Sequence, residues 1–226
     1  KRRDWSVLSN PQVTGEATDP ASVIAEFTDF YGALYHRKTP LPAAKAAALD
    51  TLRDPQSPRV LPPTAATCDA PITFEEVEAV LDSLPSGKSP GPDRIPTKFY
   101  KTFSSLLAQI LVDVYAESRA KGALPASFLE GTVSVMYKDK GARDDPRNYR
   151  PITLLNADYK IFTRVLTTRM NAAILQCTSP QQNGFVPGGF IAENLMLLKS
   201  IQALCDDEDL EAMLIFLDME KAFDRV

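Results

Sequence analysis

A carboxylate at the end of an apolar run is the most chemically suggestive feature of the sequence. Residues 213–217 read Met-Leu-Ile-Phe-Leu, and Asp218 follows them directly. A continuous apolar run of this length is typical of a β-strand that is buried on both faces. Burying an ionised carboxylate there costs free energy unless a cation or several donors lie close to it. Two interpretations of Asp218 therefore stay open: a ligand of a metal ion, or the N-cap of a helix that begins at Met219.

Basic residues concentrate upstream of this run. Between Tyr137 and Met170 there are eight Lys and Arg and four Asp, so this stretch is positive although the chain as a whole has a net charge of −4. Phosphate groups are bound by local patches, so the acidic total does not exclude a nucleic acid partner. Arg150 stands out because it follows an aromatic residue and precedes Pro151, and because a guanidinium pairs with two phosphate oxygens at once. For most of the other cations, taken singly, a solvated surface is the simpler interpretation.

The elements that must position these residues are both helical and extended. Thr73 and Glu76 form a capping-box pattern at the start of an amphipathic helix that stops at Pro85. Apolar spacing predicts further helices over residues 97–119, which Gly122 ends, from Asn156 as its N-cap to about Leu175, and over 191–204. Strands are predicted over 132–138, which a polar turn connects back to Tyr149, and over 182–186. Because helices and strands mix without regular alternation, the predicted fold class is α+β.

The first 70 residues differ from the rest. Eleven of the 18 prolines lie between Pro40 and Pro96, where they favour short helices joined by turns. Helical spacing predicts an amphipathic helix over 21–37, packed on another part of the chain, and a second helix over 42–53. A loop is expected from residue 54 to 71. We therefore place a boundary near Ala70, between a helical, proline-rich extension (1–70) and a second unit (71–226).

Composition narrows the class of protein. A chain with 44% hydrophobic residues and nearly balanced charge is typical of a globular protein. The sequence has no apolar run of membrane-spanning length and no apolar signal-peptide core at its start, so an intracellular protein without a membrane partner is expected. Three widely spaced cysteines and a single histidine leave little material for a disulfide framework, a zinc site or a Ser-His-Asp triad.

Four segments, taken in order, resemble the reverse transcriptase domain of non-LTR (LINE-type) retrotransposons. They are 86–96 (SGKSPGPDRIP), 148–156 (NYRPITLLN), 182–188 (QNGFVPG) and 216–226 (FLDMEKAFDRV). The resemblance covers about residues 72–226. It implies a right-hand polymerase fold, of which this chain holds the fingers and the first part of the palm. It also implies an RNA-directed DNA polymerase that joins nucleotides with two Mg²⁺ ions.

The resemblance also implies roles for individual residues. Asp218 matches the family's first catalytic, metal-binding aspartate, and the backbone carbonyl of Met219 would complete the metal shell. The positions that match nucleotide-binding residues are Lys138, Arg150, Met219 and Phe223. Phe223 would lie beneath the sugar of the incoming nucleotide, although core packing explains an aromatic residue there equally simply.

A further segment matches the part of the family that lies against the template. Its residues are Gln182, Gly184 and Phe185, and a turn is the alternative interpretation of Gly184. Two positions depart from the family pattern: Arg94 stands where glycine is common, and Gly189 where a basic residue is usual. The implied partners are an RNA template, a DNA primer and deoxynucleoside triphosphates, and an endonuclease fused upstream fits the same family.

The sequence stops at Val226, ahead of the family's second carboxylate motif. One strand-end carboxylate does not hold two divalent ions, so this polypeptide is expected to be a truncated fragment that is inactive by itself. A catalytically inactive remnant that binds nucleic acid is the alternative hypothesis, and a helical scaffold that binds none is a third.

Overall fold

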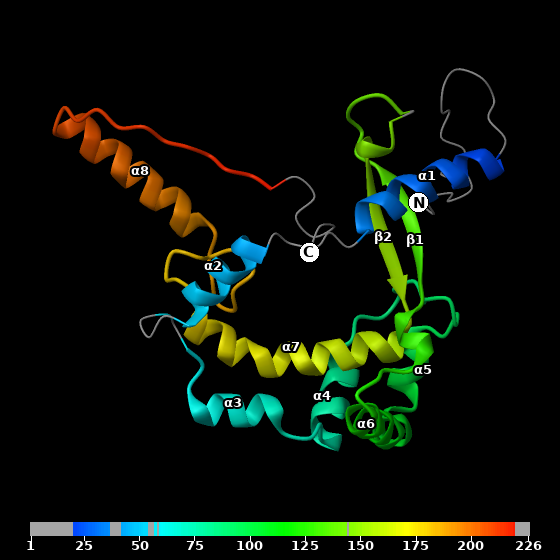
Figure 1. Ribbon diagram of the computed structural model, residues 1–226. Helices are drawn as coiled ribbons and strands as arrows, with labels where there is room; N and C mark the ends of the chain where they lie inside the picture. The colour runs from blue at the N-terminus through cyan, green and yellow to red at the C-terminus, as the bar shows by residue number, and fades with distance from the viewer. Residues whose placement is uncertain (1–19, 37–41, 54–56, 58, 144, 220–226) are drawn as a thin grey trace.

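One small sheet, eight α-helices and two short 3₁₀-helices (Ala126–Leu129 and Pro146–Asn148) lie in the part of the chain that the computed structural model describes, residues 20–36, 42–53, 57, 59–143 and 145–219 (Figure 1). The helices are α1 (Pro20–Tyr35), α2 (Pro42–Arg53), α3 (Pro62–Asp69), α4 (Phe74–Ser83), α5 (Thr97–Thr102), α6 (Ser104–Lys121), α7 (Ala157–Cys177) and α8 (Ala192–Asp207). Strands β1 (Gly131–Tyr137) and β2 (Tyr149–Leu155) pair antiparallel. This mixture is compatible with the predicted α+β class.

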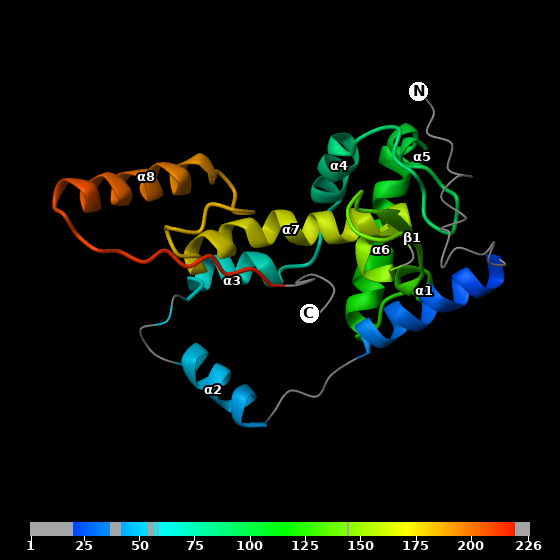
Figure 2. The same cartoon turned by 90° about the horizontal axis from the view of Figure 1, so that it is seen from above.

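Helix α7 is the central element of the fold (Figure 1). Helices α3 and α4 pack along it, and α4 also contacts α6. The ribbon of β1 and β2 rises from the N-terminal end of α7, whereas α8 lies beyond its other end (Figure 2). The ribbon and α8 therefore stand apart on the same long helix.

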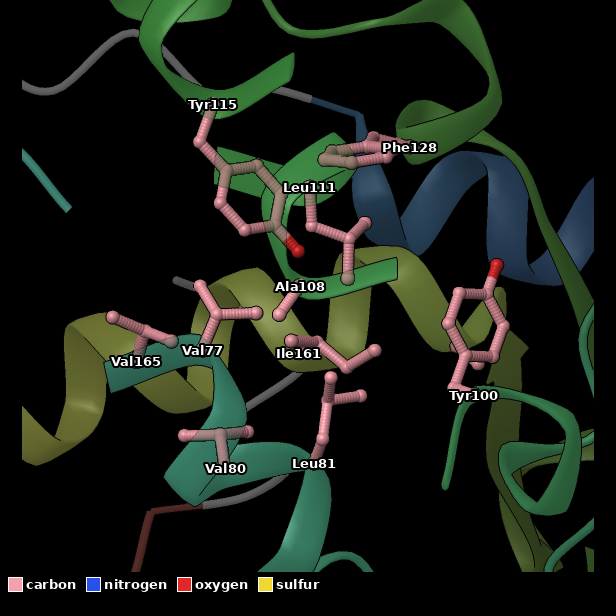
Figure 3. Close-up of a cluster of buried hydrophobic side chains, with 11 residues drawn as sticks. Val77, Val80, Leu81, Tyr100, Ala108, Leu111, Tyr115, Phe128, Ile161 and Val165 are labelled. Carbon is pink, nitrogen blue, oxygen red and sulfur yellow. The ribbon is translucent and has the colours of Figure 1, made fainter. Parts of the chain in front are cut away.

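The main hydrophobic core lies between α4, α6 and α7 (Figure 3). Its four fully buried large side chains are Val77, Leu81, Ile161 and Val165, which recur at helical spacing on α4 and α7. Burying a side chain of this kind stabilises the fold by about 1.5–3 kcal/mol. This cluster therefore fixes α7 relative to α4 and α6.

Several local predictions are confirmed at the ends of elements. The Thr73 side chain accepts a hydrogen bond from the Glu76 amide, and Glu76 accepts one from the Thr73 amide, so the capping box is present. Gly122 ends α6 in the left-handed conformation, with φ of 62°. The predicted helix over 97–119 is instead two helices, because the chain leaves helical geometry at Phe103.

Asn156 stands at the N-cap position of α7, as predicted, yet its side chain does not cap the helix. The amide nitrogen donates to the Ser127 carbonyl (3.0 Å), and the amide oxygen accepts from the Asp93 backbone (3.2 Å). Gly91 lies directly against Asn156, where an added Cβ would come within 2.3 Å of Oδ1. The loop around Gly91 is thus packed onto the β2–α7 junction, because only a glycine leaves room for the asparagine.

Replacing Arg94 with glycine is expected to raise the free energy of unfolding by about 0.5–1 kcal/mol. Arg94 has φ of +61°, a conformation that costs an L-residue about 1–2 kcal/mol and glycine nothing. Part of the gain is lost to the greater freedom of glycine in the unfolded chain. Urea denaturation of Arg94→Gly beside Arg94→Ala measures the effect, since alanine keeps the strain. Equal midpoints for the two variants would show that backbone strain is not the cause.

Helix α1 covers one face of the ribbon (Figure 1, Figure 2). Val23, Phe27 and Tyr31 are buried against Tyr149, and the Phe27 ring meets the Tyr149 ring edge-on at 5.0 Å. The Tyr31 hydroxyl donates to the Tyr149 carbonyl (3.4 Å). The prediction of an amphipathic helix packed on another part of the chain is confirmed. Among the described residues, α1 covers one face of the ribbon, and the opposite face is called the open face below.

Three predicted segments differ in the structure. The expected loop over 54–71 contains α3, which begins with a Pro-Pro pair that suits the first turn of a helix. The expected strand over 182–186 is a series of turns. The expected buried strand over 213–218 is extended but unpaired and exposed, with Leu217 at 92% exposure.

A common physical reason explains the two missing strands. A β-strand is stabilised by hydrogen bonds to a neighbouring strand and by cover over its apolar faces. In the part of the chain that is described, β1 and β2 pair only with each other, and neither borders residues 182–186 or 213–218.

Among the described helices, none is long and apolar enough for a membrane crossing.

Candidate functional site

The open face of the ribbon carries the two cations predicted to bind a nucleotide. In an antiparallel pair, directly opposed residues point to the same face and successive residues alternate. Arg150 opposes Met136, whereas Tyr149 opposes Tyr137 on the face that α1 covers. Arg150 therefore lies on the face away from α1, and so does Lys138, two residues beyond Met136. Arg150 is exposed there.

The tip of the ribbon is held by its own polar contacts. The Lys138 amide donates to the Asn148 carbonyl (2.8 Å), and its ammonium donates to the Arg147 carbonyl (2.8 Å). The Arg147 guanidinium pairs with Asp145 (2.9 Å), and Arg143 lies over the Tyr137 ring at 4.9 Å. These contacts position Lys138 near the open face, while Arg147 and Arg143 take part in the structure of the turn.

Arg169 is one of the eight Lys and Arg residues between Tyr137 and Met170, but it does not lie on an exposed basic surface. Its side chain is only 6% exposed, and its guanidinium donates to both carboxylate oxygens of Glu76 at 2.6 Å. It also donates to the carbonyls of Cys68 (3.4 Å), Ala70 and Pro71 (2.6 Å). The simple expectation of a solvated cation is wrong here, because the α3–α4 connection presents a carboxylate and three carbonyls to α7.

Three ionisable side chains in the helical part of the structure, Glu76, Asp158 and Tyr100, have shifted pKa values. Hydrogen bonds from Arg169 hold the pKa of Glu76 below its usual value. At the start of α7, burial raises the pKa of Asp158, and the negative charge of Asp93 adds to that effect. Burial, together with these two carboxylates, raises the pKa of Tyr100 to about 12, so its hydroxyl stays neutral at physiological pH.

The loop between α7 and α8 carries the three residues predicted to meet a template. The side-chain amide of Gln182 donates a hydrogen bond from Nε2 to the Gly184 carbonyl (2.8 Å), which closes a tight turn. Phe185 follows with φ of +61° and is 97% exposed. An aromatic ring so exposed offers a flat apolar surface to solvent. The three residues are adjacent in space because they share one short loop.

Gly189, the position where the resembling family has a basic residue, is enclosed by the same loop. An added Cβ would come within 2.4 Å of the Asn183 carbonyl oxygen. Asn183 is itself held by a side-chain hydrogen bond to Asn194 at the start of α8 (2.7 Å). In this loop conformation a side chain at position 189 has no room, which accounts for glycine there.

The predicted catalytic residue lies in a very different setting from the one expected. Asp218 and Met219 are exposed at the end of the extended segment, and Phe223 lies outside the described residues. Within the described residues, no ion pair joins Asp218 to Arg150 or to any other cation. The expectation of a carboxylate buried at a strand end is wrong because nothing described covers the apolar run that precedes it.

The described residues do not assemble a metal centre. No group of three or more His, Cys, Asp or Glu side chains suited to a metal ion occurs among them. A divalent ion such as Mg²⁺ takes several oxygen ligands, and one carboxylate supplies too few. The predicted sites thus form three separate groups: the ribbon face, the loop over 182–185, and the segment that ends in Asp218.

Comparison with known proteins adds a second line of argument. Residues 137–226 match the profile of a protein family described as "Reverse transcriptase (RNA-dependent DNA polymerase)". A Xenopus laevis protein, "Transposon TX1 uncharacterized 149 kDa protein", is 34% identical over 158 residues, which are 70% of this chain and 12% of that protein.

Two Drosophila melanogaster proteins match a similar share of the chain. "Probable RNA-directed DNA polymerase from transposon BS" is 29% identical over 160 residues, 69% of this chain and 17% of that protein. "RNA-directed DNA polymerase from mobile element jockey" is 25% identical over 157 residues, with the same two shares. The chain therefore spans between one tenth and one fifth of the length of these relatives.

Proposed function

This chain belongs to the reverse transcriptase family of non-LTR retrotransposons, and we propose that it forms part of an RNA-directed DNA polymerase that extends a DNA primer on an RNA template. The observation that carries the proposal is the position of the family match. Residues 137–226 contain every site residue predicted from the sequence, from Lys138 on the ribbon to Phe223. Independent matches to transposon proteins cover about 70% of the chain.

The ribbon face supports a role in binding the triphosphate. Arg150 is exposed on the open face, and Lys138 is oriented by its contact with the Arg147 carbonyl. We propose that Arg150 grips the phosphates with its planar fork and that Lys138 adds a second positive charge. Helix α1 packs on the opposite face and does not cover this one.

The 182–185 loop supports a role in template binding. The Phe185 residue is 97% exposed, and a base stacks readily on an exposed aromatic ring, with a gain of about 1–3 kcal/mol. Gly184 has open space around its Cα, since an added Cβ would meet only the Gln182 amide at 3.7 Å. We propose that this loop lets a template base approach the backbone closely.

Asp218 is proposed as one ligand of the catalytic Mg²⁺, with Met219 supplying a backbone carbonyl beside it. The oxygen chemistry of this pair suits Mg²⁺, but the described residues do not complete its coordination. Two such ions in polymerases lower the barrier by stabilising charge on the attacking and leaving oxygens. This chain's own contribution would be to hold one metal and to orient the nucleotide through Arg150.

The exposed segment over 213–217 is proposed to be a palm strand in the assembled polymerase. Its five apolar side chains are all more than half exposed, which is unfavourable in water and typical of a surface that another element covers. Pairing with further strands would bury these side chains and would fix Asp218 at the strand end.

Template-directed synthesis tests the proposed function directly. The protein encoded by the whole reading frame that contains this chain is incubated with oligo(dT) annealed to poly(rA), dTTP and Mg²⁺. Radiolabelled dTTP is expected to enter the primer, and incorporation is expected to stop when Mg²⁺ is removed by EDTA. Retention of the RNA–DNA duplex without incorporation would favour a catalytically inactive remnant.

Replacing Arg150 with alanine is expected to raise the KM for dTTP about tenfold or more in this assay, because charge-assisted hydrogen bonds to phosphate are lost. Arg150→Lys keeps the positive charge but lacks the planar guanidinium, so its KM for dTTP should lie between those of the wild type and Arg150→Ala. Lys140→Ala, an exposed cation near the tip of the ribbon, is the matched control and should leave KM within twofold. Equal KM values for all three variants would remove Arg150 from triphosphate binding.

A further inference from the structure

A second group of cations lines a pocket between the 84–89 loop and α7. The pocket has a volume of about 570 Å³ and is lined by Leu84, Pro85, Lys88, Ser89, Thr97, Leu154, Lys160, Thr163, Arg164 and Thr167. We propose that it binds the phosphodiester backbone of single-stranded RNA, as a contact separate from Arg150 and Lys138. The proposal rests on the proposed function for the identity of the polyanion as an RNA template.

The three cations are brought together from two elements. Lys88 comes from the loop after α4, whereas Lys160 and Arg164 are one turn apart on α7 and so share a face of the helix. The loop is held in place next to α7, because Thr97 donates to the Pro85 carbonyl (3.1 Å) and Asn156 holds the Asp93 amide. The pocket is therefore a consequence of tertiary packing.

The charge of the pocket is unbalanced. None of the residues that line it is acidic. Within the described parts of the chain, the Lys88, Lys160 and Arg164 side chains make no ion pair. Thr163 and Thr167 donate their hydroxyl hydrogens to carbonyls of α7, so the cations are the main donors available to a ligand. An anion with several phosphates is the ligand that would neutralise such a group.

The two acidic residues of an adjoining pocket do not pair with these cations. A smaller neighbouring pocket contains Arg164 together with Glu75 and Glu76. Glu76 is already paired with Arg169 through both of its oxygens. Glu75 makes no ion pair with Arg164 within the described residues, so Glu75 does not occupy the guanidinium donors that a ligand would use.

The shape favours an extended strand over a single phosphate. From Lys160 to Thr167 the helix rises about 10 Å, and Lys88 adds a third positive charge from a different element. Leu154 lines the pocket. It lies four residues after Arg150 in β2 and so on the same face of the ribbon. A strand that occupies the pocket can therefore continue along the open face of the ribbon.

The salt dependence of RNA binding tests this inference. Affinity of the 226-residue chain for a fluorescein-labelled 20-mer of oligouridylate is measured by anisotropy between 0.05 and 0.5 M KCl, for the wild type and for Lys160→Gln/Arg164→Gln. Loss of two contacts to a single strand makes the log–log salt slope shallower by about 1.4. If the two proteins have equal affinity when extrapolated to 1 M salt, this slope difference makes the variant bind roughly 25-fold more weakly than the wild type at 0.1 M salt.

A matched double variant separates this pocket from general charge effects. Lys98→Gln/Lys121→Gln removes the same charge from exposed positions outside the pocket and should leave the slope within about 0.3 of the wild type. Equal slopes for the two double variants, or no binding by the wild type at 0.05 M, would overturn the inference. So would displacement of the labelled RNA by 1 mM UTP, since that would identify a mononucleotide site.

The two proposals fail in different ways. If the pocket variant loses salt-dependent binding but the whole protein incorporates no dTTP, the RNA contact stands and the polymerase activity does not. If incorporation occurs and the pocket variant binds RNA like the wild type, the polymerase activity stands and the pocket assignment is wrong.

Discussion

Replacing Arg169 with methionine is expected to lower the free energy of unfolding by about 3 kcal/mol, because the partly exposed Glu76 carboxylate and three backbone carbonyls lose the buried guanidinium that donates to them. Methionine keeps the unbranched, helix-favouring chain, so the loss reports the guanidinium itself. The guanidinium uses its donors on Glu76 and on three carbonyls of the α3–α4 connection. Urea denaturation followed by circular dichroism measures the change.

The double variant Glu76→Leu/Arg169→Met isolates the ion pair within this network. It should be less destabilised than the sum of the two single variants by about 1–3 kcal/mol, because it leaves no unpaired charge. Lys121→Met is the control, since Lys121 forms an exposed pair with Glu117 and pairs of that kind contribute little. A loss below about 1 kcal/mol for Arg169→Met would mean that the network does not stabilise the fold.

The same pair predicts a pH dependence. The folded-state pKa of Glu76 is below its ordinary value of 4.5, chiefly through its hydrogen bonds to Arg169. Its contribution to stability is therefore fully present above pH 4.5 and is lost as the pH falls through the lower, folded-state value. In Arg169→Met the largest cause of this lowering is removed, whereas the hydrogen bonds with Thr73 remain, so the wild-type stability should fall more steeply than that of the variant below pH 4.5. Denaturation midpoints from pH 7 to 3 test this difference.

Replacing Asp218 with asparagine is expected to reduce primer extension by the whole protein by about a hundredfold or more. A metal ligand contributes several kcal/mol of charge stabilisation in the transition state, and each 1.36 kcal/mol is a factor of ten in rate. Asparagine has nearly the same shape but lacks the negative charge. The initial rate of dTTP incorporation on poly(rA) at saturating Mg²⁺ is the measurement.

In the structure, the Asp218→Asn substitution should change activity without changing stability. Asp218 is exposed and makes no ion pair within the described residues, so the variant chain should have the same thermal midpoint as the wild type. Asp209→Asn is the matched control, because it makes the same chemical change at an exposed position upstream. Equal incorporation by Asp218→Asn and wild type would remove Asp218 from the mechanism.

Short-range signals were sufficient for most of the helices and for strand β1, whereas β2 was not predicted as a strand. The capping box at Thr73, the left-handed glycine at position 122 and the alternation over 132–138 depend on neighbours within a few residues, and all three are confirmed. Helix α1 was predicted from its apolar stripe, although nothing in that stripe indicated that its partner would be Tyr149. The order of the four motifs was enough to indicate the family, because the motifs are recognised by residue type and sequence order and do not depend on how the chain packs.

Burial was the property that local patterns predicted least well. An apolar run such as 213–217 forms a buried strand only if other strands and helices cover it, and in the described structure none does. Asn156 likewise occupies a cap position, but the approach of the loop around Gly91 diverts its side chain to other partners.

By itself, the sequence determined the family and the positions of most helices and of strand β1, and it nominated the residues proposed to bind nucleotide and metal. Tertiary structure alone decided which cations are available to a ligand. Arg169 and Arg164 lie five residues apart on α7, yet one is buried against Glu76 and the other lines an open pocket. The reason is that five residues turn a helix by about 500°, which places the two side chains on different faces, and only the packing of α3 and α4 determines which face is covered.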